Sequence, residues 1–206
     1  MAIGRPRAFD IDQALEQAMQ VFWRLGYEGA SVAELTRAMG ISSPSLYAAF
    51  GSKEGLFKAV LDHYAARREK CLAEVLGAPT AREAAERLLF GLVDLMTDPE
   101  EPPGCLFLQG GLTCGVTTQE IPQELARRRA YLETTLQERF TQARDAGDLP
   151  ASADPAALAR YLVAVCNGIA VQAASGAGRD ELRQIAALAL NAWPIAWMKR
   201  PATVEG

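Results

Sequence analysis

Residues 41–57, ISSPSLYAAFGSKEGLF, contain the strongest local signals for the fold of this chain. The serines and the early proline of this stretch predict the start of a very short helix, which ends near Phe50. Leu46 and Phe50 are four residues apart, so both face the same side of this helix, toward a core. Ser52 is then the N-cap of a long helix over 53–76. The outward side of the short helix carries small and hydroxylated residues and one phenol, and such a surface can press closely against another molecule.

Two further helices are predicted before this stretch. Asp10 is a good N-cap and Gly26 a good stop, so the first helix covers the residues between them and buries one apolar face. The run Ser31-Val32-Ala33-Glu34 is a capping box that opens a second helix, which Gly40 ends. Two short helices with a glycine in the turn, packed on a longer first helix, form a helix-turn-helix.

The rest of the chain also has helical periodicity, and no strand-period alternation of useful length appears. Further helices are predicted over about 81–97, 105–112, 122–146, 155–174 and 180–197. The expected fold is therefore all-α, with about nine helices in total. We expect two domains: a head over residues 1–52, continued by the start of the connecting helix 53–76, and a larger helical body over 77–206.

Charge and composition are those of an ordinary globular protein of 206 residues with a net charge of -4. The head is close to neutral and the body acidic, which permits binding to nucleic acid without arguing for it. The first residues contain no apolar segment of the secretory kind, so a cytoplasmic location is expected. The uncharged stretch 161–178 contains polar residues and three glycines, and we interpret it as a buried helix rather than a membrane span.

Three segments together resemble the head of the TetR (tetracycline-repressor-like) family of transcriptional regulators. They are GRPRAFD, the run from Ser31 to Leu35 and, above all, ISSPSLYAAFGSKEGLF, and the resemblance covers roughly residues 5–62. It implies a homodimeric, DNA-binding regulator with a helical body that senses a signal. The expected partners are double-stranded operator DNA and a small-molecule effector that releases a repressor from that operator, and no cofactor is expected.

The resemblance also implies which residues of the head meet DNA. Ser43, Pro44, Ser45 and Ala48 would face the major groove from the recognition helix, while Tyr47 and Lys53 would donate to phosphates. Ser31 would meet a phosphate at a helix N-terminus, and Arg5 and Arg7 would reach the flanking backbone or the minor groove. Two of these residues each have a plainer alternative. Tyr47 could be partly packed against the protein, and Ser31 could serve only as a helix cap.

This head departs from the commoner family pattern, which has Lys-Gly before the hydroxyl residue and His-Tyr after the tyrosine. Ser43-Pro44 and Ala48-Ala49 occupy those positions here. Base contacts from long side chains are therefore scarce, so contacts with thymine methyl groups and indirect readout must carry more of the specificity.

The last two helices are predicted to form the dimer interface, because each is apolar on more than its core face. The predicted interface residues are Ala159, Val163, Cys166, Ala170, Leu182, Ile185, Ala189 and Trp193. The alternative is a purely internal core.

Residues that could line an effector pocket in the body are apolar or aromatic, with one amide and one thiol. They are Phe90, Met96, Cys105, Phe107, Gln109, Tyr131 and Phe140, although residues of this kind at helical spacing more often belong to the plain core. Cys105 also suggests a regulator that responds to oxidants or electrophiles, because the N-terminus of a helix lowers the pKa of a thiol there. Cys114 lies nine residues further on, about 13 Å of helical rise away, too far for a disulfide unless the helix unwinds.

Catalysis is not expected from this sequence. The single histidine, His63, is interpreted as a solvated surface residue, and neither Cys-x-x-Cys nor a metal-ligand set nor a glycine-rich phosphate loop is present. A thiol enzyme and an architectural DNA-binding protein without an effector remain the alternatives.

Overall fold

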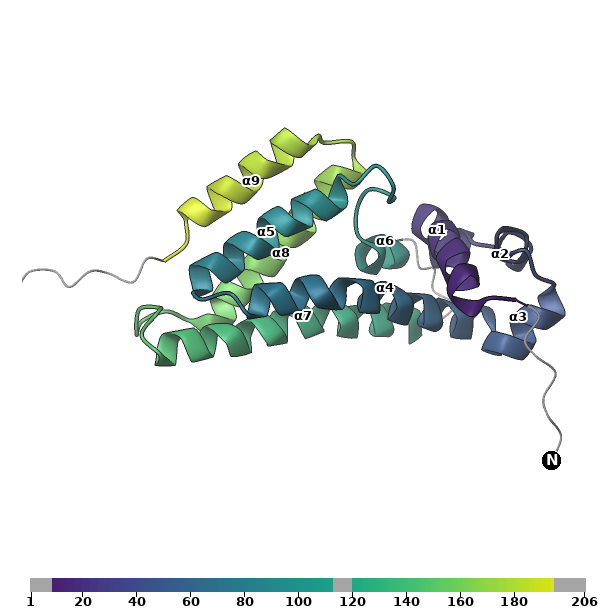
Figure 1. The fold of residues 1–206 in the computed structure, drawn as a ribbon, viewed down its shortest axis with the longest axis horizontal. Coiled ribbons are helices and arrows are strands. Elements are labelled where there is room, and N and C mark those ends of the chain that lie inside the picture. Colours follow the sequence, from purple (N-terminus) through teal and green to yellow (C-terminus); the bar gives the residue numbers. More distant parts are fainter. Residues whose placement is uncertain (1–8, 113–119, 195–206) are drawn as a thin grey trace, which may run out of the picture. The chain divides into compact units, whose positions relative to one another are not determined.

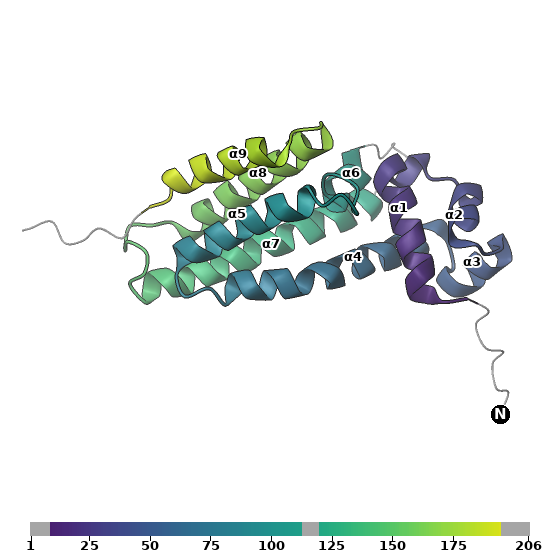
Figure 2. The same ribbon diagram turned by 45° about the horizontal axis from the view of Figure 1, so that its top comes forward.

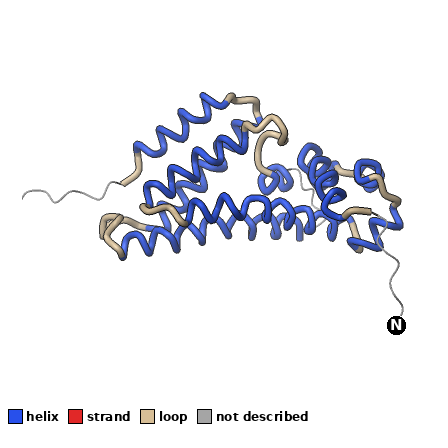
Figure 3. The backbone as a smooth tube through the Cα atoms, in the orientation of Figure 1, coloured by secondary structure: helices blue, strands red, loops and turns tan. Residues whose placement is uncertain are grey.

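The computed structural model describes residues 9–112 and 120–194, so the predicted functional residues Arg5, Arg7 and Cys114 lie outside the described part. The described residues form helices joined by loops and contain no strand, which confirms the all-α fold (Figure 3). The helices are α1 (Ile11–Gly29), α2 (Val32–Met39), α3 (Ser43–Phe50), α4 (Lys53–Leu76), α5 (Ala81–Met96), α6 (Leu106–Leu112), α7 (Glu120–Asp145), α8 (Pro155–Ala174) and α9 (Arg179–Asn191).

Side-chain caps begin the helices where the sequence predicts them. The backbone N–H of Gln13 donates to the Asp10 carboxylate at 3.1 Å, and that of Gly55 donates to the Ser52 hydroxyl at 2.9 Å. The Thr80 hydroxyl accepts from the backbone of Glu83 at 3.1 Å. These caps satisfy N–H groups that have no partner within their own helix, and they fix where each helix starts.

Two helix ends differ from the prediction. Gly26 breaks α1 as predicted, with φ 70° and ψ 175°, but one further turn follows it as far as Gly29. At the other end of the chain, α9 ends at Asn191 rather than near Trp197, so Trp193 follows the helix. The apolar residues after Asn191 continue the sequence pattern, and that pattern alone does not locate a helix end.

The chain divides into two packing units, whose boundary falls within α4 and within α7. Unit 1 comprises Met1–Lys70 and Gly104–Arg128, and unit 2 comprises Cys71–Pro103 and Arg129–Gly206. The predicted head over 1–52 lies in unit 1, which also contains α6 and the beginning of α7, two elements that were expected in the body.

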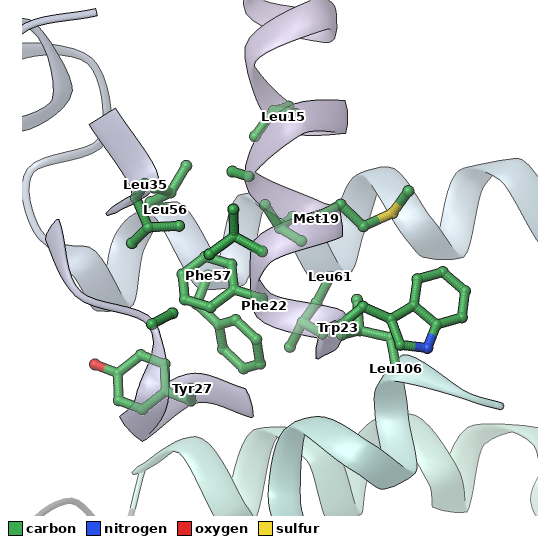
Figure 4. Close-up of a cluster of buried hydrophobic side chains, with 14 of the residues drawn as sticks. Leu15, Met19, Phe22, Trp23, Tyr27, Leu35, Leu56, Phe57, Leu61 and Leu106 are labelled. Atoms are coloured by element: carbon green, nitrogen blue, oxygen red, sulfur yellow. The ribbon is translucent and has the colours of Figure 1, made fainter. Parts of the chain in front are cut away.

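The core of unit 1 lies where α1, α2 and α3 gather around the first half of α4 (Figures 1 and 2). Phe22 and Phe57 meet edge to face there with ring centroids 4.8 Å apart (Figure 4). Leu106 of α6 is completely buried in the same cluster, together with Ile121 and Leu125 of α7. The hydrophobic core of the helix-turn-helix is therefore completed by residues that follow it by about fifty positions or more.

Unit 2 is built around α5, α8 and α9, which pack on one another (Figures 1 and 2). Arg82 of α5 donates to the carbonyl of Leu190 at 3.0 Å, and Arg139 of α7 donates to the carbonyls of Leu76 and Ala78. Among the described helices, α8 alone is long and apolar enough to cross a membrane. This helix nevertheless packs on α5 and α9, and one side of it is buried in unit 2. The buried residues between positions 159 and 173 are Ala159, Leu162, Val163, Cys166, Ile169, Ala170 and Ala173.

Candidate nucleic-acid interface

The face of α3 that the sequence assigns to DNA is open to solvent. Leu46 is fully buried and Phe50 packs against the core of unit 1, as predicted. Pro44 and Ala48 are exposed on the other side, and 49% of Tyr47 is accessible. About half of Tyr47 is therefore covered by the protein and half is open to solvent, so partial packing and a contact with DNA are both compatible with its position.

The serines at the start of α3 are partly committed to capping. The Ser42 hydroxyl accepts from the backbone N–H of Ser45 at 3.3 Å, and the two hydroxyl oxygens are 2.8 Å apart. Ser45 and Ser43 are both half-buried. Ser45 thus lies beside the exposed face of α3, and its hydroxyl is oriented by the capping hydroxyl of Ser42. The prediction did not include Ser42 among the DNA-binding residues.

Lys53 opens α4 directly after the turn that ends α3. Gly51 forms this turn with φ 76°, and its backbone N–H donates to the carbonyl of Tyr47 at 2.9 Å. Lys53 is half-buried, and its Nζ lies 4.5 Å from the centroid of the Tyr27 ring. No local pattern marked Tyr27 as a partner of this lysine, because the two residues are far apart along the chain.

Ser31 forms the capping box that the sequence predicts, and this box occupies its hydroxyl. The Ser31 Oγ donates to Glu34 Oε2 at 2.7 Å and accepts from the Glu34 backbone N–H at 3.2 Å. The Ser31 hydroxyl and the Ser31 backbone N–H, which donates to the same carboxylate oxygen at 3.0 Å, hold the pKa of the Glu34 carboxyl below its ordinary value. A carboxylate therefore lies at the N-terminus of α2, where a phosphate was expected, and the capping role of Ser31 is the one that its contacts favour.

The predicted pocket residues are divided between the two units. Cys105, Phe107 and Gln109 belong to unit 1, whereas Phe90, Met96, Tyr131 and Phe140 belong to unit 2. In unit 2, Met96 and Phe140 are buried, and Phe140 packs on Trp193 with ring centroids 5.2 Å apart. The Phe90 ring lies beneath the Arg183 guanidinium at 4.8 Å, and 65% of Tyr131 is accessible.

Two of the unit 1 members of this set, Cys105 and Phe107, contact Tyr64, a buried residue of α4. The Tyr64 hydroxyl donates to Cys105 Sγ at 3.7 Å, and the Phe107 ring meets the Tyr64 ring edge to face at 4.9 Å. Burial raises the pKa of the Tyr64 phenol well above its usual value, so the hydroxyl stays protonated at neutral pH. Cys105 is half-buried and packs against the core of unit 1, so its environment is shared with the helices of the predicted helix-turn-helix.

Most of the predicted interface residues of the last two helices are buried in their own chain. Ile185 is half-buried, and the other seven are buried: Ala159, Val163, Cys166, Ala170, Leu182, Ala189 and Trp193. A residue covered by its own subunit has little surface left for a partner, so these seven serve as the internal core of unit 2. The apolar residues that remain open on the same helices are Ala157, Tyr161, Ala164, Gly168, Val171 and Ala174 of α8 and Ala187 and Leu188 of α9.

His63 is more engaged than a solvated surface residue. Its Nε2 lies 3.4 Å from Glu16 Oε2, and Arg67 donates to the same carboxylate at 3.0 Å. These contacts join α4 to α1 within unit 1 and place His63 in the structural framework of the head.

Both parts of the chain match known regulators. Residues 14–60 match the bacterial regulatory proteins of the tetR family, and residues 84–190 match the tetracyclin repressor-like C-terminal domain. The HTH-type transcriptional repressor ComR of Escherichia coli is 37% identical over 193 residues, which are 93% of this chain and 92% of ComR.

Solved structures agree with these matches. A cysteine mutant of the TetR family transcriptional regulator CifR, complexed with 26bp double-strand operator DNA, is 44% identical, with a TM-score of 0.89. The alignment covers 92% of this chain and all of the CifR chain. A TetR-type regulator from Rhodococcus sp. RHA1 is 46% identical with a TM-score of 0.62, over 88% of this chain and 98% of that one. This chain therefore belongs to the tetR family of bacterial regulatory proteins and is a DNA-binding transcriptional regulator.

Proposed function

We propose that the chain works as a homodimeric repressor in the cytoplasm and leaves its operator when an effector binds or modifies it. The observation that carries the DNA-binding part is the exposed face of α3, with Leu46 buried behind it and Tyr47 and Lys53 at its side. Pro44 and Ala48 would lie against base edges, while Tyr47 and Lys53 would donate to phosphates. The separation of a DNA-binding head (1–52) from a sensing and dimerising body (77–206) is part of this proposal.

Dimerisation is required because two recognition helices must reach two half-sites about one helical turn apart. The CifR structure contains a double-stranded operator, the kind of partner that we assign to this chain. We assign the interface to the exposed apolar face of α8 and α9, defined here as Ala157, Tyr161, Ala164, Gly168, Val171 and Leu188. The Tyr161 hydroxyl donates to the carbonyl of Ala189 at 3.2 Å, which joins the two helices beside Leu188.

We further infer that this chain acts by binding and not by catalysis. A regulator needs only that an effector favours one of two conformations of the dimer, one of which fits the operator. For a small-molecule effector, the half-buried Phe107 and Gln109 remain the candidates in unit 1 and Phe90 in unit 2.

Lys53→Ala and Tyr47→Phe test the DNA contacts. Because phosphate contacts carry no sequence information, both variants are expected to weaken binding to the operator and to unrelated duplexes alike. Lys53→Ala should also reduce the slope of log K against log salt by about 2 for the dimer, since two cationic contacts are lost. Tyr47→Phe removes a neutral donor and should leave that slope unchanged.

Fluorescence anisotropy at several salt concentrations measures these effects. Lys70→Ala on the same helix and Tyr131→Phe at another accessible phenol are matched controls, and both should bind like the wild type. Unchanged affinity in Lys53→Ala and Tyr47→Phe would remove both residues from the interface.

A regulator that responds to electrophiles is the second candidate function, and the contact of Cys105 with Tyr64 favours it. A group added to Cys105 Sγ would disturb the hydrogen bond that Sγ accepts from the Tyr64 hydroxyl, and Tyr64 is buried among core residues of the DNA-binding unit. With iodoacetamide, the Cys105 thiolate would form a carbon–sulfur bond and iodide would leave. Such a change in unit 1 would shift the head away from the conformation that fits the operator.

We expect Cys105 to alkylate faster at neutral pH than Cys71 or Cys166, and the alkylated protein to release its DNA. Cys105→Ser should bind DNA normally and remain bound after treatment, whereas Cys71→Ser, which replaces an exposed thiol, should still respond. Mass spectrometry after limited alkylation gives the order of reaction. Equal or slower labelling of Cys105 would contradict the electrophile mechanism and leave the small-molecule effector alone.

A further inference from the structure

Lys53 is held in an unusual way for a surface lysine. Its ammonium lies 4.5 Å from the centroid of the Tyr27 ring, within the distance at which a cation is attracted to the face of an aromatic ring. Tyr27 itself is only 8% exposed. The lysine is therefore in contact with a fixed part of the protein at the point where α4 begins.

The backbone and the core fix the Tyr27 ring in place. Gly26, with φ 70°, breaks α1 in a conformation that favours glycine and so turns the chain just before Tyr27. The ring then stacks on Phe22 at 6.2 Å with an interplanar angle of 12°, and it lies 5.1 Å from Phe57. Figure 4 shows these three rings together in the hydrophobic cluster. A ring packed in this way has little freedom to move with the lysine.

The charges near Lys53 are consistent with an ammonium that has lost part of its water. Partial burial lowers the pKa of Lys53, and the carboxylate of Glu28 offsets part of this effect by favouring the charged form. A partly desolvated ammonium interacts more strongly with the next anion that it meets. In a DNA-binding head, that anion is a backbone phosphate.

We propose that Tyr27 is a positioning residue for DNA binding, whose ring holds the Lys53 ammonium where it meets a phosphate. This inference rests on the phosphate contact of Lys53 under the proposed function. A free lysine has a flexible four-carbon stem, and ordering this stem costs conformational entropy when DNA binds. Because the ring already orders the Lys53 side chain in the free protein, less conformational entropy is lost when DNA binds.

Tyr27→Leu removes the ring face, and Tyr27→Phe keeps it while removing only the hydroxyl. We expect Tyr27→Leu to weaken binding about two- to fivefold per head, which matches the strength of an exposed cation–π pair. Tyr27→Phe should bind like the wild type. In a Lys53→Ala background, Tyr27→Leu should have no further effect, since the residue that it positions is absent.

A labelled duplex of about 30 base pairs, long enough for two half-sites one turn apart, is a sufficient probe. If Lys53→Ala leaves affinity unchanged, the phosphate contact of the proposed function fails. If Lys53→Ala weakens binding but Tyr27→Leu costs as much in the Lys53→Ala background as in the wild type, the positioning role of Tyr27 is overturned and the phosphate contact stands.

A second measurement needs no destabilising variant. The chain has four lysines, at positions 53, 58, 70 and 199. Reductive ¹³C-methylation therefore gives few signals, and Lys53→Arg assigns the signal of Lys53. Its methyl resonance should be shifted upfield by the Tyr27 ring current in the wild type and in Tyr27→Phe. An unshifted Lys53 resonance in the folded wild type would contradict the contact, whether or not Tyr27→Leu folds.

Discussion

Leu188→Glu is expected to convert the protein to a monomer and to abolish operator binding. Leu188 is an α9 residue whose side chain is 69% exposed in the single chain, and it lies next to Ala189, whose carbonyl accepts from Tyr161 of α8. If this face meets a second copy, a two-fold axis places the new carboxylate in the interface twice. An unpaired, desolvated carboxylate on each side costs about 4 kcal/mol or more in total, which raises the dimer dissociation constant by roughly a thousandfold.

Light scattering and anisotropy together measure this effect. Leu25→Glu is the matched control, because Leu25 is an exposed leucine of α1, outside the proposed interface. It should remain dimeric. Val171→Glu, in the exposed part of α8, should behave like Leu188→Glu. If both Leu188→Glu and Val171→Glu remained dimeric, the interface would have to lie elsewhere on the chain.

The sequence predicted the start of nearly every helix, because helix starts depend on local signals. Asp10 and Ser31 each cap the helix that they were assigned, and Ser42 and Thr80 cap helices that were predicted to begin directly after them, with hydrogen bonds between residues three positions apart. The inward direction of Leu46 also followed from helical spacing alone. Features that depend on a few neighbouring residues are therefore accessible from one sequence.

Features that depend on packing between distant segments were not predicted. The helix α8 has apolar residues on several sides, and no local signal shows which side is covered by the same chain. Because α5 and α9 both pack on α8, they cover the side that includes Ala159 and Cys166, and Tyr161, Gly168 and Val171 are left exposed. The sequence assigned the interface to α8 and α9, the helices to which we also assign it under the proposed function, but to side chains that the structure buries.

The same reasoning explains why the contact between Tyr27 and Lys53 was not predicted. Tyr27 meets Lys53 only because Gly26 turns the chain and α4 packs against α1. Glu34 was recognised as part of a capping box, but its negative charge at the helix N-terminus was not weighed against the phosphate expected there. The sequence pattern predicted that this surface is suited to binding DNA. The structure shows which side chains on it are already in contact with other groups of the protein.

Leu106→Ala is expected to destabilise the DNA-binding unit itself, although Leu106 lies far from the helix-turn-helix in sequence. Its side chain is fully buried in the cluster that includes Phe22, Phe57 and Leu61 (Figure 4). Truncation of a buried leucine to alanine leaves a cavity and costs about 2–5 kcal/mol. This loss is a large share of the stability of an ordinary domain, so the head should melt at a clearly lower temperature.

Leu108→Ala is the matched control, since Leu108 belongs to the same short helix but is only half-buried. It should cost much less than Leu106→Ala in urea unfolding followed by tryptophan fluorescence, because Trp23 lies in the core of unit 1. Equal effects of the two substitutions would mean that α6 does not contribute to this core through Leu106.

The contribution of α6 to this core has a functional consequence. Because α6 supplies part of the core of the DNA-binding unit, a ligand or a modification that moves α6 acts directly on the helices that hold α3. The proposed response at Cys105, the residue just before Leu106, would use this connection.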